Sequence, residues 1–169
     1  TLLSLFIIIS LSSLRAQDFQ QISVGASYAS QSFYDLDTKT SVDIASSDWD
    51  IILTTFGLQD AGIHIYEATN VSFGAPAPRV ELYLAESAYE NITAFDTTLQ
   101  RLHNDESSWA FGAFNVDRAA GDQLDYGWGR YNPATRQVVG DEAFIIKLRS
   151  GEFKKVKIES LDATVYNIK

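Results

Sequence analysis

The sequence predicts an all-β fold, an antiparallel sandwich or barrel-like single domain with at most one short helix. Aromatic residues, which favour strands, are frequent and spread along the chain, with eight Tyr, ten Phe and three Trp. Apolar residues alternate or form short runs of strand length, and long runs at helical period are scarce. The strand-like runs follow one another without intervening helices, as they do in antiparallel sandwiches and barrels.

The N-terminal segment, residues 1–16, is predicted to be a secretory signal peptide cleaved after Ala16. The apolar run Leu2–Leu11 is too short to span a hydrocarbon core of about 30 Å, and the small residue that ends the polar stretch suits signal peptidase. Because an initiator Met and a basic segment are missing, we expect the start to be truncated. The alternative is a buried N-terminal strand or helix built on Phe6–Ile9. The signal predicts a secreted protein, extracellular or on the outer cell surface.

Residues 17–169 are predicted to form one β domain, because their number suits a single ordinary domain. The chain contains no Cys, so it has no disulfide framework, no thiolate metal site and no lipid-anchoring cysteine. With 22 acidic and 13 basic residues, its net charge of −9 disfavours nucleic acid and anionic lipid as partners. The last residues, Asn167–Lys169, read as the middle of a strand, so we expect the C-terminus to be truncated.

Strand patterns begin soon after the predicted signal. The segment Ile22–Ser27 alternates in polarity, and Ser32–Leu36 and Ser41–Ile44 flank the turn residues Asp37–Lys39. Alternating segments joined by a short polar turn are typical of a β-hairpin. We therefore expect a first strand followed by a hairpin.

The middle of the chain contains two further strand candidates and the best helix candidate. The run Trp49–Phe56 is almost continuously apolar and predicts a central strand buried on both faces, whereas Gly62–Val71 alternates and predicts a half-buried one. The proline-containing segment 73–79 is a predicted loop. Residues Val80–Leu102 fit a helical stripe only in part, since several Thr and Asn residues interrupt it, so one short helix at most is expected there.

The C-terminal third closes with a predicted hairpin. The polar segment Asn115–Gln123 is a predicted loop and is followed by the aromatic segment Asp125–Tyr131. The two arms of the hairpin are Ala143–Leu148 and Glu152–Ile158. The pair Ser150–Gly151 between them supplies the conformational freedom that a tight turn needs.

Two histidines, His64 and His103, are the strongest candidate ligands for a soft metal or haem iron, because Cys and Met are both absent. Together in space they would form a bis-histidine haem site. Since His64 lies between Ile63 and Ile65 in a strand, it faces away from both, and Tyr66 shares its face. The alternative interpretation makes His64 a solvent-facing strand residue and His103 a loop residue.

Aromatic residues supply a second set of candidate ligand contacts. The rings of four residues could stack on a sugar or a porphyrin, so haem and a glycan are the ligands considered: Trp109, Tyr126, Trp128 and Tyr131. The alternative is that these rings fill the core or close one end of a barrel. The glycines beside them then serve the geometry of the backbone.

Carboxylates cluster at Asp48–Asp50, Asp117–Asp125 and Asp141–Glu142. None of these clusters has the spacing of a calcium-binding loop, so no metal site is predicted, although a structural Ca²⁺ stays an alternative. Two carboxylates at a suitable distance suffice for glycoside hydrolysis, but solvated surface charge is the favoured interpretation. The chain lacks a G-x-S-x-G nucleophile motif and a phosphate-binding glycine loop, which disfavours serine hydrolases and nucleotide enzymes.

Several motifs give the chain a family resemblance. The run SYASQSFYDL, the W-D-I segment at Trp49–Ile51 and the motifs SSWAFGAFN, DYGWGRYN, GDEAFIIKL and SGEFKKVKI resemble secreted proteins of the Bacteroidetes type that carry HmuY-like domains and are often exported by type IX secretion. The W-D-I segment and the closing hairpin are the parts similar to the HmuY haem-binding family. The resemblance implies an all-β extracellular domain that captures haem through two histidines.

Three functions follow as hypotheses. The first is a secreted or cell-surface, non-enzymatic binding domain, whose ligand is haem or another planar or glycan molecule. The second is a structural or adhesive passenger domain of a larger exported protein, without a small-molecule site. The third is a carboxylate-dependent hydrolase, which depends on the aspartate clusters alone.

Overall fold

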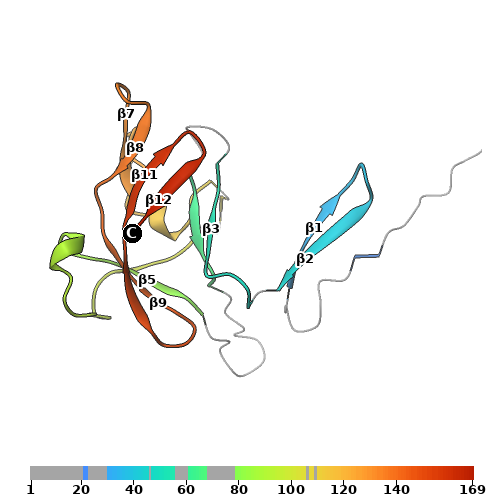
Figure 1. Ribbon diagram of the computed structural model, residues 1–169, viewed down its shortest axis with the longest axis horizontal. Coiled ribbons are helices and arrows are strands. Elements are labelled where there is room, and N and C mark those ends of the chain that lie inside the picture. The colour runs from blue at the N-terminus through green and yellow to red at the C-terminus, as the bar shows by residue number, and fades with distance from the viewer. Residues whose placement is uncertain are drawn as a thin grey trace, which may run out of the picture. The chain divides into compact units, whose positions relative to one another are not determined.

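The computed structural model describes residues 21–22, 30–45, 47–55, 61–67, 79–105, 107–108 and 110–169. The predicted signal segment, most of the predicted strand Ile22–Ser27 and Trp109 lie outside the described residues. The chain forms two compact units, Thr1–Ile44 and Ala45–Lys169. The described parts consist mainly of antiparallel strands and contain two 3₁₀ turns but no α-helix, which confirms the predicted fold class (Figure 1). Their sheets do not close into a barrel.

The first unit contains the predicted hairpin. Its strands are β1 (Ser30–Asp35) and β2 (Thr40–Ala45). The carboxylate of Asp35 organises the turn, because its Oδ1 accepts hydrogen bonds from the backbone N–H groups of Asp37, at 2.8 Å, and Thr38, at 2.9 Å. An aspartate in this arrangement stabilises the turn locally.

In the second unit, one four-stranded sheet has the order β10-β9-β5-β6. Its strands are β5 (Glu81–Leu84), β6 (Arg101–Leu102), β9 (Phe144–Lys147) and β10 (Phe153–Val156). The predicted helix candidate therefore splits into two strands with a single 3₁₀ turn, η2 (Tyr89–Asn91), between them. The predicted closing hairpin is confirmed as β9–β10, with Gly151 at a positive φ of 86° in its turn.

The other four-stranded sheet has the order β12-β11-β8-β7. Its strands are β7 (Gly129–Asn132), β8 (Gln137–Gly140), β11 (Ile158–Asp162) and β12 (Val165–Ile168). Lys157 carries the chain from β10 into β11, and its backbone N–H and C=O groups bond to those of Lys169, both at 2.9 Å. The second arm of the predicted hairpin thus ends at Val156, and Ile158 already belongs to the other sheet. Figure 1 shows β7, β8, β11 and β12 at one end of this unit and β5 and β9 at the other.

A short two-stranded sheet pairs β3 (Ile51–Leu53) with β4 (Ile63–Ile65), and it reverses the predicted burial of these segments. β3 was expected to be central, but among the described strands it pairs with β4 alone, and its Leu53 is 39% exposed. β4 was expected to be half-buried, yet all three of its residues are buried. The reason is that the 3₁₀ turn η3 (Ala113–Asn115) packs against β4, and a period-two pattern does not reveal such a cover.

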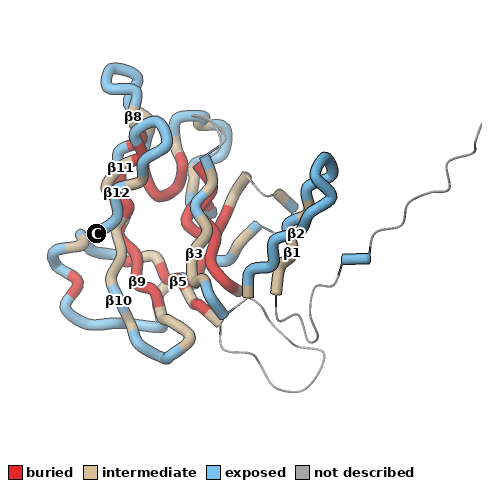
Figure 2. The backbone as a smooth tube through the Cα atoms, turned by 45° about the vertical axis from the view of Figure 1, so that its right-hand side comes forward, coloured by how far each residue is buried: buried red, intermediate tan, exposed pale blue. Residues whose placement is uncertain are grey.

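The core of the second unit is built from large side chains of these sheets and the turns between them. Its largest fully buried members are Trp128, Phe114 and Phe144, and the rings of the last two meet edge to face with centroids 4.7 Å apart. A smaller cluster around Tyr83 and Ile145 lies on the other face of the β5–β9 sheet. In Figure 2 buried residues lie along the inner strands, while the hairpin tips are exposed. No helix within the described ranges is long and apolar enough to cross a membrane.

Candidate functional site

The side chain of Asn115 joins three segments in the interior. It is 2% exposed; its Oδ1 accepts hydrogen bonds from the N–H groups of Ile63, at 2.9 Å, and Gly112, at 3.2 Å. Its Nδ2 donates to the carbonyl oxygens of Ala61, at 3.1 Å, and Tyr126, at 2.9 Å. Two donors and two acceptors are thereby paired, as a buried amide requires.

The side chain of Asn104 likewise forms hydrogen bonds with backbone groups at the other end of β4. Its Oδ1 accepts from the N–H groups of Ile65 and Ala113, both at 3.0 Å, and its Nδ2 donates to the carbonyl oxygen of Ile65 at 2.7 Å. One edge of β4 pairs with β3, so the two asparagines satisfy the backbone groups of the other edge. Side-chain amides thus take the place of a third strand, and they fix the segments that carry the candidate site.

Gly112 explains how η3 comes so close to β4. Its φ of −87° is ordinary, but a Cβ at this position would overlap the carbonyl group of Ile63. Because only glycine allows this approach, the residue is required for space and not for conformation. The hydrogen bonds of Asn115 depend on the same closeness.

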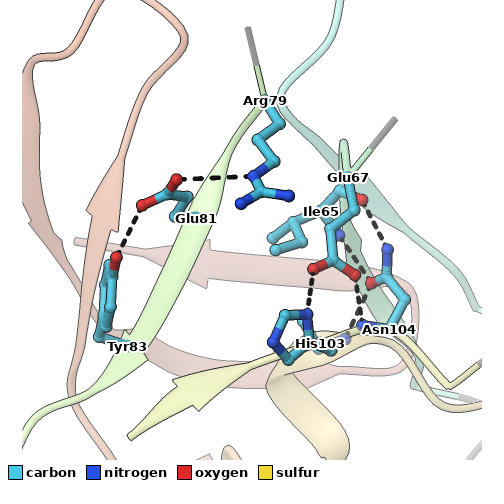
Figure 3. Close-up of polar contacts among 8 residues, drawn as sticks. Ile65, Glu67, Arg79, Glu81, Tyr83, His103 and Asn104 are labelled. Atoms are coloured by element: carbon cyan, nitrogen blue, oxygen red, sulfur yellow. Dashed lines mark hydrogen bonds and ion pairs between the residues drawn. The ribbon is translucent and has the colours of Figure 1, made fainter. Parts of the chain in front are cut away.

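His103 and Glu67 form a polar pair on the surface beside Asn104 (Figure 3). The imidazole Nδ1 of His103 lies 2.7 Å from Oε1 of Glu67, and the backbone N–H of Asn104 donates to Oε2 at 2.7 Å. The His103 side chain is 59% exposed, whereas that of Glu67 is 18% exposed. The carboxylate therefore holds the imidazole from the protein side and orients it toward solvent.

His103 lines one hollow, and a second hollow shares the side chains of Phe111 and Arg118 with it. The His103 hollow measures about 540 Å³ and is lined by His103, Asn104, Asp105, Phe111, Asn115, Val116 and Arg118. The Tyr126 hollow measures about 270 Å³ and is lined by Ala61, Ala110, Phe111, Arg118, Gln123, Asp125 and Tyr126. The guanidinium carbon of Arg118 lies 4.1 Å from the centre of the Phe111 ring, a cation–π contact at the border of the two.

His64 lies in a different environment from His103. It is 6% exposed in β4, opposite Ile52, and it does not line the His103 hollow. The interpretation of His64 as a solvent-facing strand residue is therefore wrong, because the face of β4 that it occupies is covered. The structure gives one exposed and one buried imidazole, and no described hollow has both in its lining.

The aromatic candidates fall into three environments. Trp128 is completely buried and donates from Nε1 to the carbonyl oxygen of Ala61 at 3.2 Å, so its ring is closed to a ligand. Tyr66 is buried against Trp49, edge to face at 5.0 Å. Tyr126 alone of these lines a hollow, and Trp109 lies outside the described residues.

The predicted carboxylate clusters are used mainly within the fold. Asp125 accepts backbone hydrogen bonds from Ala119 and Gly127, and Asp122 pairs with Arg130 at 2.8 Å. Glu142 differs, because burial, followed by the nearby carboxylates, raises its pKa above the usual value. It lines a hollow of about 250 Å³. Within the described residues, no three His, Cys, Asp or Glu side chains gather as a metal site would require.

The residues that organise this region were not predicted as site residues. Asn115 was placed in a polar loop, and Glu67, Asn104 and Arg118 were not singled out. A weak signal exists for Asn115, since it directly follows the apolar run Trp109–Phe114 and is itself followed by Val116. The partners of Glu67 are 36 and 37 positions away, so no local pattern reveals them.

Comparisons of this chain with protein-family models, with curated proteins and with solved structures found no match.

Proposed function

We propose that this protein is a secreted or cell-surface, non-enzymatic binding domain whose ligand site is the His103 hollow, and that haem or a closely similar metalloporphyrin is the ligand. The single observation that carries the proposal is the 2.7 Å contact between Nδ1 of His103 and the carboxylate of Glu67. It stands beside a hollow large enough for a small molecule.

The contact with Glu67 supports a role for His103 as an iron ligand. An ionised carboxylate only accepts hydrogen bonds, so in the neutral imidazole the proton resides on Nδ1 and the lone pair on Nε2. Within the described chain, Nε2 of His103 has no hydrogen-bond partner. Metal-binding histidines usually donate their other nitrogen to a carboxylate or carbonyl group, which raises their basicity and fixes the ring.

The lining of the hollow suits a planar, anionic ligand. Its volume of about 540 Å³ lies within the usual range of small-molecule sites. Phe111 and Val116 offer apolar contact, and Arg118 offers a guanidinium group that can pair with a carboxylate of the ligand. A porphyrin with acidic substituents combines these features with a metal that accepts one imidazole.

The proposal uses one histidine and not two. His64 is buried in β4 and belongs to a different environment, so the ligand set differs from the pair that the family resemblance implies. We propose His103 as the one protein ligand to iron, with the opposite side of the iron open to water.

The test is a titration of the purified protein with haemin, followed in the Soret region. The proposal predicts saturable binding that His103→Ala weakens at least tenfold, because ligation is lost. His64→Ala is the matched control and should bind haemin as the unaltered chain does. Equal Soret changes with and without His103, or none with the unaltered protein, would count against the proposal.

A structural or adhesive passenger role is the second candidate, and one observation favours it. The β1–β2 hairpin exposes several apolar side chains, with Phe33 56%, Leu36 83% and Val42 63% exposed. Apolar groups gathered on one short hairpin are typical of contact surfaces. If this role is correct, replacing these three residues by Ser abolishes self-association or surface attachment and leaves haemin binding unchanged.

A further inference from the structure

The side chain of Arg101 in β6 has a buried polar edge without partners. Its Nε and Nη2 atoms are enclosed by protein, yet neither makes a hydrogen bond with a described residue. A buried donor without an acceptor costs free energy, and the cost is greater for a charged group. These two nitrogens form one edge of the guanidinium, the fork that binds two oxygens of a carboxylate or phosphate at once.

Glu81, a carboxylate that interacts electrostatically with Arg101, is already engaged. Arg101 lies opposite Tyr83 in the β5–β6 pair, and Tyr83 and Glu81 share that face of β5. Oε2 of Glu81 accepts the Tyr83 hydroxyl at 2.7 Å and lies 3.5 Å from the ammonium of Lys147. Its Oε1 lies 3.6 Å from Nε of Arg79 (Figure 3).

This cluster therefore carries an excess of positive charge. Among the described residues around Glu81, Arg79, Arg101 and Lys147 supply three cations to its one carboxylate, in a chain whose net charge is −9. The side chains of Arg79 and Lys147 are 33% and 36% exposed, so the cluster reaches the surface although the fork of Arg101 does not. A partly buried group of like charges attracts an oppositely charged ligand.

We propose that the Arg101 fork, together with Arg79 and Lys147, is a binding site for an oxyanion group, a carboxylate or a phosphate. The two outer cations draw the anion in, and a shift of their partly exposed side chains lets the enclosed fork bind two of its oxygens. A carboxylate or phosphate offers one oxygen to each nitrogen, whereas chloride is a single acceptor that the two N–H groups must share. The site is independent of the His103 hollow, since its lining does not include any of these three cations.

The test measures the melting temperature of the protein with increasing inorganic phosphate, with chloride adjusted to hold the ionic strength constant. At ten times the dissociation constant, the unaltered chain should gain about 3 to 6 °C. Arg101→Lys keeps the charge but removes the fork, and it should abolish this gain. Acetate tested in the same way distinguishes a carboxylate site from a phosphate site.

Two further variants separate binding from a general salt effect and from misfolding. Arg130→Lys alters an arginine in the other sheet that pairs with Asp122, and it should keep the full phosphate response. Glu81→Gln removes the competing carboxylate and should tighten phosphate binding, on the order of fivefold. The proposal is overturned if phosphate stabilises Arg101→Lys as much as the unaltered chain, or if Glu81→Gln leaves the phosphate affinity unchanged.

Discussion

The backbone N–H of Ile63 donates a 2.9 Å hydrogen bond to the side-chain amide of Asn115, across 52 positions of sequence. This bond places the 3₁₀ turn η3 against the free edge of β4. The same turn follows Phe111 and precedes Arg118, which border both hollows. The candidate site therefore depends on the side-chain amide of Asn115, which forms hydrogen bonds that a further strand would otherwise supply to β4.

Replacing Asn115 by Leu should destabilise the protein by about 3 to 5 kcal/mol, because it removes the partner of the N–H groups of Ile63 and Gly112 and of the carbonyl oxygen of Tyr126. Chemical denaturation measures the free energy of unfolding. Asn167→Ala removes an exposed amide that bonds to Ser160, and it should change stability by less than about 0.5 kcal/mol. Similar costs for the two variants would contradict the role assigned to Asn115.

Gly112→Ala should cost at least about 2 kcal/mol, because the new methyl group overlaps the Ile63 carbonyl and pushes η3 from β4. Gly121→Ala is the informative control. Gly121 has a positive φ of 83° but open space around its Cβ position, so its substitution should cost only about 1 kcal/mol. If the two variants melt at the same temperature, the close approach at Gly112 is not required.

Glu142→Gln should raise the melting temperature of the protein at pH 7 and leave it unchanged near pH 4. Burial raises the pKa of Glu142, so the folded state prefers the protonated form. The folded protein then loses stability as the pH rises from the unfolded value, about 4.5, through the raised pKa. Because the group is partly exposed, the gain at pH 7 should be at most about 0.5 kcal/mol.

Glu90→Gln provides the opposite sign in the same melting experiment. Backbone hydrogen bonding, followed by Lys169, lowers the pKa of Glu90, so its contribution is present above the unfolded value and is lost as the pH falls. This variant should be less stable than the unaltered protein at pH 7 and equal to it in acid. A gain in stability at pH 7 for Glu90→Gln would show that the ionised Glu90 carboxylate does not stabilise the folded protein through its hydrogen bonds and Lys169.

Glu67→Gln should weaken haemin binding about 10- to 100-fold, because the imidazole of His103 loses the carboxylate that orients it. Iron-free protoporphyrin should bind both proteins equally, since it has no metal for His103 to bind. Fluorescence measures the iron-free porphyrin and absorbance measures haemin. Glu152→Gln, which alters an exposed glutamate paired with Lys154, is the control and should leave both affinities unchanged. Equal losses for haemin and the iron-free porphyrin would mean that Glu67 shapes the hollow and does not act through iron.

The β class and both hairpins were predicted because their signals are local. Alternation and turn residues at Asp37–Lys39 and Ser150–Gly151 lie within a few positions of the strands that they join. The burial of β4 and of Asn115 was not predicted, because it depends on partners about fifty positions away. Local polarity suggests a loop for Asn115, and only the pairing of all its polar atoms makes its burial favourable.

The candidate site was predicted in part. His103 and Tyr126 both line hollows, but His64 and Trp128 lie in the interior. The alternation of side chains along a strand predicts which face a residue occupies, but it does not predict what covers that face. Glu67 and Arg118, two of the charged residues of the proposed site, have no motif in the sequence. Their importance follows from contacts with His103 and Phe111.

The spin state of ferric haem bound to the protein tests the central claim most directly, and electron paramagnetic resonance measures it. Ligation by His103 alone predicts a high-spin iron, because one imidazole and at most a water bind it. His64→Ala should leave that spectrum unchanged, and His103→Ala should remove it. A low-spin spectrum of two imidazoles that is lost in either variant would contradict the account.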